Sequence, residues 1–211
     1  MSTAPRRRLS ARQRREVIEL AATEVFAERG YHGASMDEIA RRSGVSPPVV
    51  YDHFESKLAL HKRLLERHFA ELREVWREHL PGDEPPEVRI ARAIDAWYAY
   101  VQTRPYVRRM LFRDTTGIPE VEAIHHAVTQ QSRQIIRPML AGERGSEHIA
   151  GADEESLDMA WEVFRATLQG LAHWWDEHPD VPRERIVQTT MNALWVGFER
   201  VRRGEVWHLP Q

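Results

Sequence analysis

The segment from Ser35 to Lys57 restricts the fold more than any other part of this chain. It has the capping and turn residues of two very short helices joined by a tight turn. Ser35 is a good N-cap and is followed by acidic residues that suit a first turn, while Gly44 stands where a helix often ends in a left-handed residue. Ser46 then precedes Pro47, a residue suited to the first position of the next helix. So short a helix is unstable alone. The spacing therefore predicts a helix-turn-helix unit, of the kind that places its second helix in a DNA major groove.

The second of these helices begins with two consecutive prolines, Pro47 and Pro48. Neither has an N–H group to leave unpaired, so we expect the Ser46 hydroxyl to cap the N–H of Val49. Pro48 also disfavours the helical conformation of the residue before it, which opposes helix formation at this point.

The same segment resembles the DNA-binding domain of TetR-type transcriptional repressors. The similarity rests on ASMDEIARRSGVS and VYDHFESK, together with AATEVFAERGYHG before them, and it is strong over roughly residues 12 to 72. The resemblance implies that residues 47 to 54 form the recognition helix, and that Ser35, Tyr51, His53 and Lys57 touch phosphates. The prolines are a departure, since the family often has a basic residue and a small one there.

The start of the recognition helix offers no side-chain hydrogen bond from Pro47, Pro48 or Val49, which can press only on thymine methyl groups. Sequence discrimination should then depend on those contacts, on Asp52 or His53, and on DNA shape. The candidate DNA-binding set comprises Ser35, Ser46, Pro47, Pro48, Val49, Tyr51, Asp52, His53 and Lys57, with Arg6, Arg7 and Arg8 in an N-terminal arm.

Charge is distributed unevenly along the chain. Residues 1 to 63 hold 12 basic and 8 acidic residues, a net charge of +4, and the rest hold 18 and 24, a net charge of −6. A basic end on an acidic body is typical of a nucleic-acid binder. We expect residues 1 to 9 to be disordered, either as a solvated tail or as a basic arm that orders in a minor groove.

The composition, with 42% hydrophobic and 29% charged residues, is that of an ordinary water-soluble protein. No apolar run is long enough to span a membrane, and the arginine-rich start lacks the apolar core of a secretory signal. The absence of cysteine excludes disulfides and thiolate metal sites. A cytoplasmic location fits these features.

Apolar residues recur at helical spacing throughout the chain, and we find no strand pattern and no internal repeat. The first helix should run from Ser10 to about Gly30, and a long helix from Ser56 to about residue 80. The prediction is an all-α fold of about nine helices. Residues 10 to 57 would form the helix-turn-helix domain, with the motif at 35 to 54, and residues 58 to 211 a larger helical regulatory and dimerisation domain.

The last two predicted helices, near residues 153 to 178 and 182 to 203, carry stripes of large apolar side chains. A second copy of the chain could cover them as a four-helix packing with two-fold symmetry, although they could instead form the core of a monomer. Similarity to the TetR family favours the homodimer. The candidate interface residues are Leu168, Trp175, Met191, Leu194, Trp195 and Phe198.

The middle helices contain aromatic and sulfur-bearing side chains that would suit a small hydrophobic or aromatic ligand, although such residues are more often plain core. The candidate ligand-binding residues, which depend mainly on the family resemblance, are Trp97, Tyr100, Met110, Phe112, His125, Trp161 and Phe164. The function indicated is a repressor that a small molecule releases from its double-stranded DNA operator.

Two other functions remain open: a constitutive DNA binder without a ligand, and an enzyme. His125 and His126 are adjacent and would diverge on a helix, and His173 with Asp176 is only a weak hint of a metal site. Phosphate-binding and nucleophile-elbow motifs are absent. We therefore expect no catalytic site, no metal and no cofactor.

Overall fold

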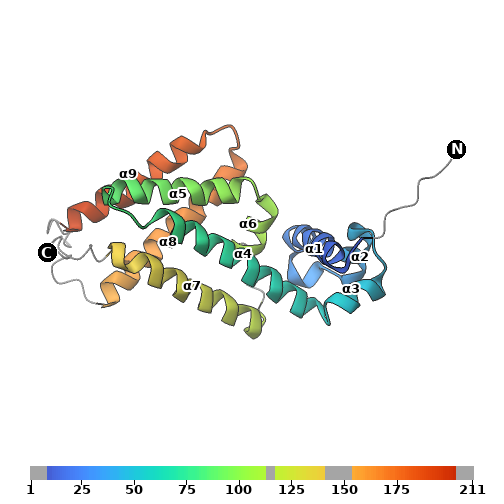
Figure 1. Cartoon of the computed structure of the whole chain (residues 1–211). Coiled ribbons are helices and arrows are strands. Elements are labelled where there is room, and N and C mark those ends of the chain that lie inside the picture. The colour runs from blue at the N-terminus through green and yellow to red at the C-terminus, as the bar shows by residue number, and fades with distance from the viewer. Residues whose placement is uncertain (1–8, 113–116, 141–153, 203–211) are drawn as a thin grey trace. The chain divides into compact units, whose positions relative to one another are not determined.

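The computed structural model describes residues 9–112, 117–140 and 154–202 (Figure 1), and within those ranges the chain is helical without strands. The prediction of an all-α fold of about nine helices is confirmed. The helices are α1 (Ala11–Gly33), α2 (Met36–Ser43), α3 (Pro47–His53), α4 (Lys57–His79), α5 (Pro86–Gln102), α6 (Pro105–Phe112), α7 (Pro119–Leu140), α8 (Glu154–Glu177) and α9 (Arg183–Arg202). The expected arm with Arg6, Arg7 and Arg8 lies outside the described residues.

The helix boundaries follow the local signals. Ser10 and Gln13 form a capping box at the start of α1, with the Ser10 hydroxyl accepting from the Gln13 N–H and the Gln13 side chain accepting from the Ser10 N–H. Gly30 breaks the helical geometry inside α1 with a φ of 67°, so the continuous helix ends there as predicted. At the start of α4, the Ser56 hydroxyl accepts a hydrogen bond from the N–H of Ala59.

The chain divides into two compact units. Unit 1 comprises Met1–Phe69 with Arg104–His125, and unit 2 comprises Ala70–Thr103 with His126–Gln211. Unit 1 contains residues 10 to 57 of the predicted DNA-binding domain and also takes in the first part of α4, α6 and the start of α7. The physical reason is tertiary, since α6 packs against α1 although some seventy residues separate them.

The core of unit 1 is built from one face of each of its helices. α1 packs against α2 and α6, and α2 packs against α3. The predicted apolar face of α1 is buried, as are Val50 and Phe54 on either side of the end of α3. These contacts hold the short helices α2 and α3, which local hydrogen bonds alone would not stabilise.

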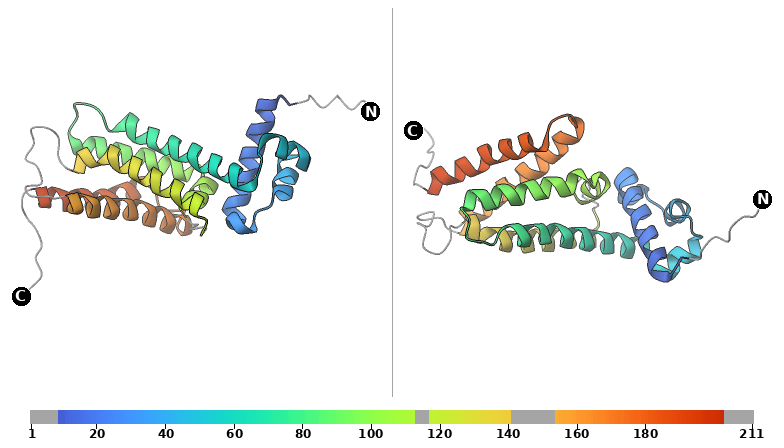
Figure 2. Two further views of the ribbon diagram at one scale, coloured as in Figure 1. Left: turned by 90° about the horizontal axis from the view of Figure 1, so that it is seen from below. Right: turned by 45° about the horizontal axis from the view of Figure 1, so that its top comes forward.

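The core of unit 2 is rich in aromatic side chains. α5 lies along α9, which in turn lies along α8 (Figure 2). The buried Tyr98 hydroxyl of α5 is hydrogen-bonded to the Thr190 hydroxyl of α9 at 2.9 Å, and the Arg183 guanidinium pairs with Asp95 at 2.7 Å. The Trp175 indole N–H donates to the Val181 carbonyl at 2.7 Å, closing the turn between α8 and α9.

Candidate nucleic-acid interface

The helix-turn-helix begins and ends as its residues predict. The Ser35 hydroxyl caps α2 by accepting a hydrogen bond from the Glu38 N–H at 3.1 Å. Gly44 adopts a left-handed conformation with a φ of 69° and its N–H donates to the carbonyls of Ala40 and Arg41. The turn between α2 and α3 is therefore set by local hydrogen bonds and by one glycine.

The expected cap at the start of α3 is wrong in one respect. The Ser46 side chain makes no capping hydrogen bond, and the Val49 N–H donates instead to the Ser46 carbonyl at 3.0 Å. The reason is that the two prolines leave Val49 with the first free N–H of the helix, and a tight first turn pairs it with the backbone directly. The exposed Ser46 hydroxyl therefore stays available for another contact.

The side chains proposed to meet DNA are mostly on the surface of α3. Pro47, Pro48 and Asp52 are exposed, the Tyr51 ring is 53% exposed, and Val49 is half-buried. The buried Val50 between them anchors α3 to the core. This is the pattern expected of a helix that packs on one side and offers the other side to a partner.

Lys57 differs from the other candidate phosphate contacts because its ammonium group is engaged within the chain. The Nζ atom donates to the carbonyls of Tyr31 and Ala34, at 2.9 and 3.0 Å, and lies 4.5 Å from the centroid of the Tyr31 ring. An ammonium has three N–H donors, so one remains for a phosphate. Lys57 thus joins the start of α4 to the turn that leads into Ser35.

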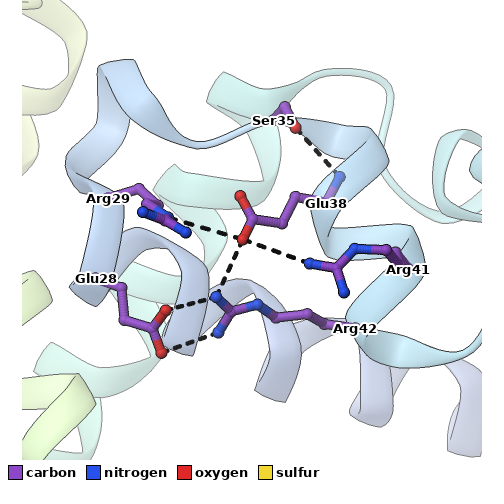
Figure 3. Close-up of polar contacts among 6 residues, drawn as sticks. All are labelled: Glu28, Arg29, Ser35, Glu38, Arg41 and Arg42. Atoms are coloured by element: carbon purple, nitrogen blue, oxygen red, sulfur yellow. Dashed lines mark hydrogen bonds and ion pairs between the residues drawn. The ribbon is translucent and has the colours of Figure 1, made fainter.

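An ion-pair network that the sequence patterns did not suggest fixes α2 on α1 (Figure 3). The Arg42 guanidinium donates to both carboxylate oxygens of Glu28, at 2.9 and 2.5 Å, and also to Glu38 at 3.0 Å. The bond from Arg42 lowers the pKa of the Glu28 carboxyl, and Glu28 in turn raises the pKa of Arg42. Arg29 and Arg41 each lie 3.8 Å from the same Glu38 oxygen. Only the pairs of Glu38 with Arg41 and Arg42, three and four residues apart, have a helical spacing that is visible in the sequence.

A buried histidine lies in the core of the same unit. The His61 ring packs against the rings of Phe26 and Tyr31, with centroids 4.5 and 5.1 Å away, and its Nδ1 atom has no hydrogen-bond partner in the described part of the chain. Burial lowers the pKa of His61 to about 4, and the positive charges of His125 and Lys57 act in the same direction. Burial likewise lowers the pKa of His125. The His61 imidazole is therefore neutral near pH 7.

Models of known protein families match the helix-turn-helix region of unit 1 and most of the remaining chain. The model described as "Bacterial regulatory proteins, tetR family" matches residues 18–64, and the one described as "Tetracyclin repressor-like, C-terminal domain" matches residues 85–195, more than half of the chain. The chain belongs to the TetR family. It is accordingly a DNA-binding transcriptional regulator and not an enzyme, and the resemblance seen in the sequence is confirmed.

Individual TetR-family relatives agree with this assignment. The chain is 29% identical over 195 residues to the HTH-type transcriptional activator FasR of Mycolicibacterium smegmatis, covering 92% of this chain and 87% of FasR. A regulator from Pseudomonas aeruginosa PAO1 has the same fold, with a TM-score of 0.74 at 21% identity over 93% of this chain and 96% of that one. So does FadR of Bacillus subtilis, solved in complex with stearoyl-CoA, with a TM-score of 0.71 at 18% identity over 92% and 100% of the chains.

The predicted ligand-binding residues of this TetR-family chain divide between the two units. Met110, Phe112 and His125 belong to unit 1, and the other four, Trp97, Tyr100, Trp161 and Phe164, belong to unit 2. In unit 2, Phe164 lies 6.0 Å from Trp161 and 5.8 Å from Trp76, measured between ring centroids. The buried Trp161 indole N–H has no acceptor among the described residues, and the Tyr100 hydroxyl donates to Glu71 at 2.7 Å. The structure thus brings Trp161 and Phe164 of the predicted set together.

The predicted dimer residues differ in their exposure within the single chain. Leu168, Trp175 and Leu194 are only 3–6% exposed in a single chain, because they pack into the core of unit 2 and leave a second copy little surface to cover. Met191, Trp195 and Phe198 are half-buried. The apolar side chains that face outward are Met159, Val163 and Trp174 on α8 and Val196 on α9, each 42–57% exposed.

The described ranges contain no helix long and apolar enough to cross a membrane. Within the same ranges, no cluster of three or more His, Asp or Glu side chains could hold a metal ion.

Proposed function

We propose that this TetR-family regulator is a repressor that leaves its operator when a small, largely apolar molecule binds to unit 2. The observation that carries the proposal is that the two compact units of the chain have different features. Unit 1 offers an exposed recognition helix that follows α2, and α2 is held on α1 by a serine cap and ion pairs. Unit 2 has an aromatic core in which the buried Trp161 N–H has no acceptor among the described residues. A buried donor without a partner is costly, and a ligand carrying an oxygen acceptor would satisfy it.

The proposed mechanism is a shift between two populations of a homodimer. Two copies of α3, related by two-fold symmetry, would enter successive major grooves of a pseudo-palindromic operator. The ligand would favour a dimer in which the spacing of these helices no longer matches the DNA. α4 and α7 are the candidate routes for this signal, since each has residues in both units.

The test is a gel shift with DNA from upstream of the protein's own gene, with and without candidate ligands. Stearoyl-CoA is the first candidate, because FadR of Bacillus subtilis shares the fold and was solved with it. Release of the DNA by a ligand supports the proposal. Binding that no ligand changes supports a constitutive DNA binder instead.

A second candidate function is transcriptional activation, which the relationship to the activator FasR favours. The two are separated by transcription in vitro from the bound promoter. A repressor lowers transcript yield and the ligand restores it, whereas an activator raises the yield. In either case we infer that the protein works in the cytoplasm and needs no resident cofactor or metal.

A further inference from the structure

The first turns of α1 lie against the end of the recognition helix. The guanidinium carbon of Arg15, on α1, lies 5.4 Å from the centroid of the Phe54 ring, and Phe54 is the residue that ends α3. The Phe54 ring is buried, and the ring of His53, a candidate phosphate contact, lies 6.4 Å from it. The Arg15 side chain therefore lies beside the residues of α3 that are assigned to DNA binding.

The charge of Arg15 is not neutralised within the described part of the chain. Its side chain is exposed and no carboxylate pairs with it, whereas Arg12 on the same helix pairs with Glu16 at 2.9 Å. The first turn of α1 also contains no acidic residue. An exposed guanidinium without a carboxylate partner can pair with a phosphate.

We infer that Arg15 is a further phosphate-binding residue, and that the Phe54 ring holds its guanidinium in place for the DNA backbone. A guanidinium that lies over an aromatic face keeps its edge N–H groups free, and these match the oxygens of a phosphate. The end of a recognition helix lies beside the backbone that flanks the groove. The contact is independent of base sequence, so it adds affinity on every site.

The test is the salt dependence of binding to a short random-sequence DNA duplex, with the unmodified protein as reference. Arg15→Gln should lower the slope of log affinity against log salt by about 0.9 per bound chain. When the salt concentration rises from about 50 to 200 mM, both proteins lose affinity. The factor of loss should be roughly threefold smaller per chain for the variant than for the unmodified protein. Arg185→Gln, the same charge change at an exposed position of α9 in unit 2, should leave the slope unchanged. An unchanged slope for Arg15→Gln, or an equal loss for both variants, would overturn the inference.

Two further variants separate phosphate binding from a purely structural role of Arg15. Arg15→Lys keeps the charge but not the planar group, so the slope should be retained while affinity falls severalfold. In a Phe54→Leu background, Arg15→Gln should cost less affinity than it does alone, because the two residues act as a unit. If Arg15→Gln lowers the melting temperature but spares the slope, Arg15 only braces α1 against α3 and the inference is wrong.

Discussion

At the scale of single residues, Lys57 combines two roles in one ammonium group. Its two hydrogen bonds and its contact with the Tyr31 ring stabilise the turn before α2, and its remaining donor is free for a phosphate. The first role depends on geometry inside the chain and the second on DNA, so they are measurable separately.

We predict that Lys57→Met destabilises unit 1 by about 1–3 kcal/mol, because two partly buried carbonyl groups lose their charged donor. Unfolding in urea followed by circular dichroism measures this change. Lys62→Met on the same helix α4 is the control and should have little effect. Equal stabilities of the two variants would contradict the structural role, and an unchanged salt slope of DNA binding would remove Lys57 from the phosphate contacts.

The buried His61 should make stability depend on pH. Its folded-state pKa of about 4 lies below the ordinary 6.5, so the unfolded chain binds a proton more readily. The free energy of unfolding should therefore be highest above about pH 6.5. It should decrease by roughly 3 kcal/mol in all as the pH drops toward about 4.

The variant His61→Phe tests this prediction, since it keeps an aromatic ring beside Phe26 but cannot titrate. Its free energy of unfolding should vary less between about pH 6.5 and 4 than that of the unmodified protein. His126→Phe, at an exposed position, should retain the full dependence. Parallel pH curves for His61→Phe and the unmodified protein would show that His61 does not control stability.

At the scale of the elements, α2 and α3 depend on their junction more than on their own length. Gly44 has a left-handed backbone, yet an added Cβ there would meet nothing within 4 Å. The cost of a side chain at this position is therefore conformational and not steric.

We predict that Gly44→Ala destabilises unit 1 by about 1–2 kcal/mol, and that Gly44→Asn costs less because asparagine tolerates this conformation. Gly170→Ala, within α8 and also without a close neighbour, should stabilise by about 0.5–1 kcal/mol. The opposite signs are measured as shifts in the thermal unfolding midpoint. Destabilisation at both glycines would mean that space, rather than backbone conformation, decides the effect.

At the scale of the whole molecule, the outward apolar face of α8 is the surface best suited to a second copy. Met159, Val163 and Trp174 are 4 and 11 residues apart, close to whole helical turns, so they share one face. Each is about half exposed in the single chain, whereas Leu194 is 6% exposed. A charged substitution should therefore have a different effect on the exposed face of α8 than at the buried Leu194.

We predict that Val163→Glu gives a folded monomer, because a charge enters the interface but not the core of the chain. Leu194→Glu should instead unfold unit 2, since the charge would be buried within the chain. Sedimentation measures the first effect, and tryptophan fluorescence the second, because all seven tryptophans fall within the residues assigned to unit 2. Val88→Glu on the exposed side of α5 should remain dimeric. A dimer that survives Val163→Glu would place the interface elsewhere.

The sequence by itself determined the helices, their ends and the helix-turn-helix. The signals for Ser10, Ser35, Gly30 and Gly44 are local, since a cap or a left-handed turn depends on hydrogen bonds between residues three or four apart. The helical character of α1 and α4 followed from the spacing of their apolar residues for the same reason. Ser46 is the exception, because side chain and backbone compete there for a single N–H group.

The tertiary structure alone decided the contacts between segments distant in the chain. Arg42 finds Glu28 fourteen residues away, Lys57 finds Tyr31 twenty-six residues away, and α6 joins unit 1 by packing on α1. It also decided which face of α8 and α9 is core, because an apolar stripe has the same pattern whether its own chain or a second copy covers it. Spacing along a helix records which residues share a face, but the partner of that face depends on how the helices pack.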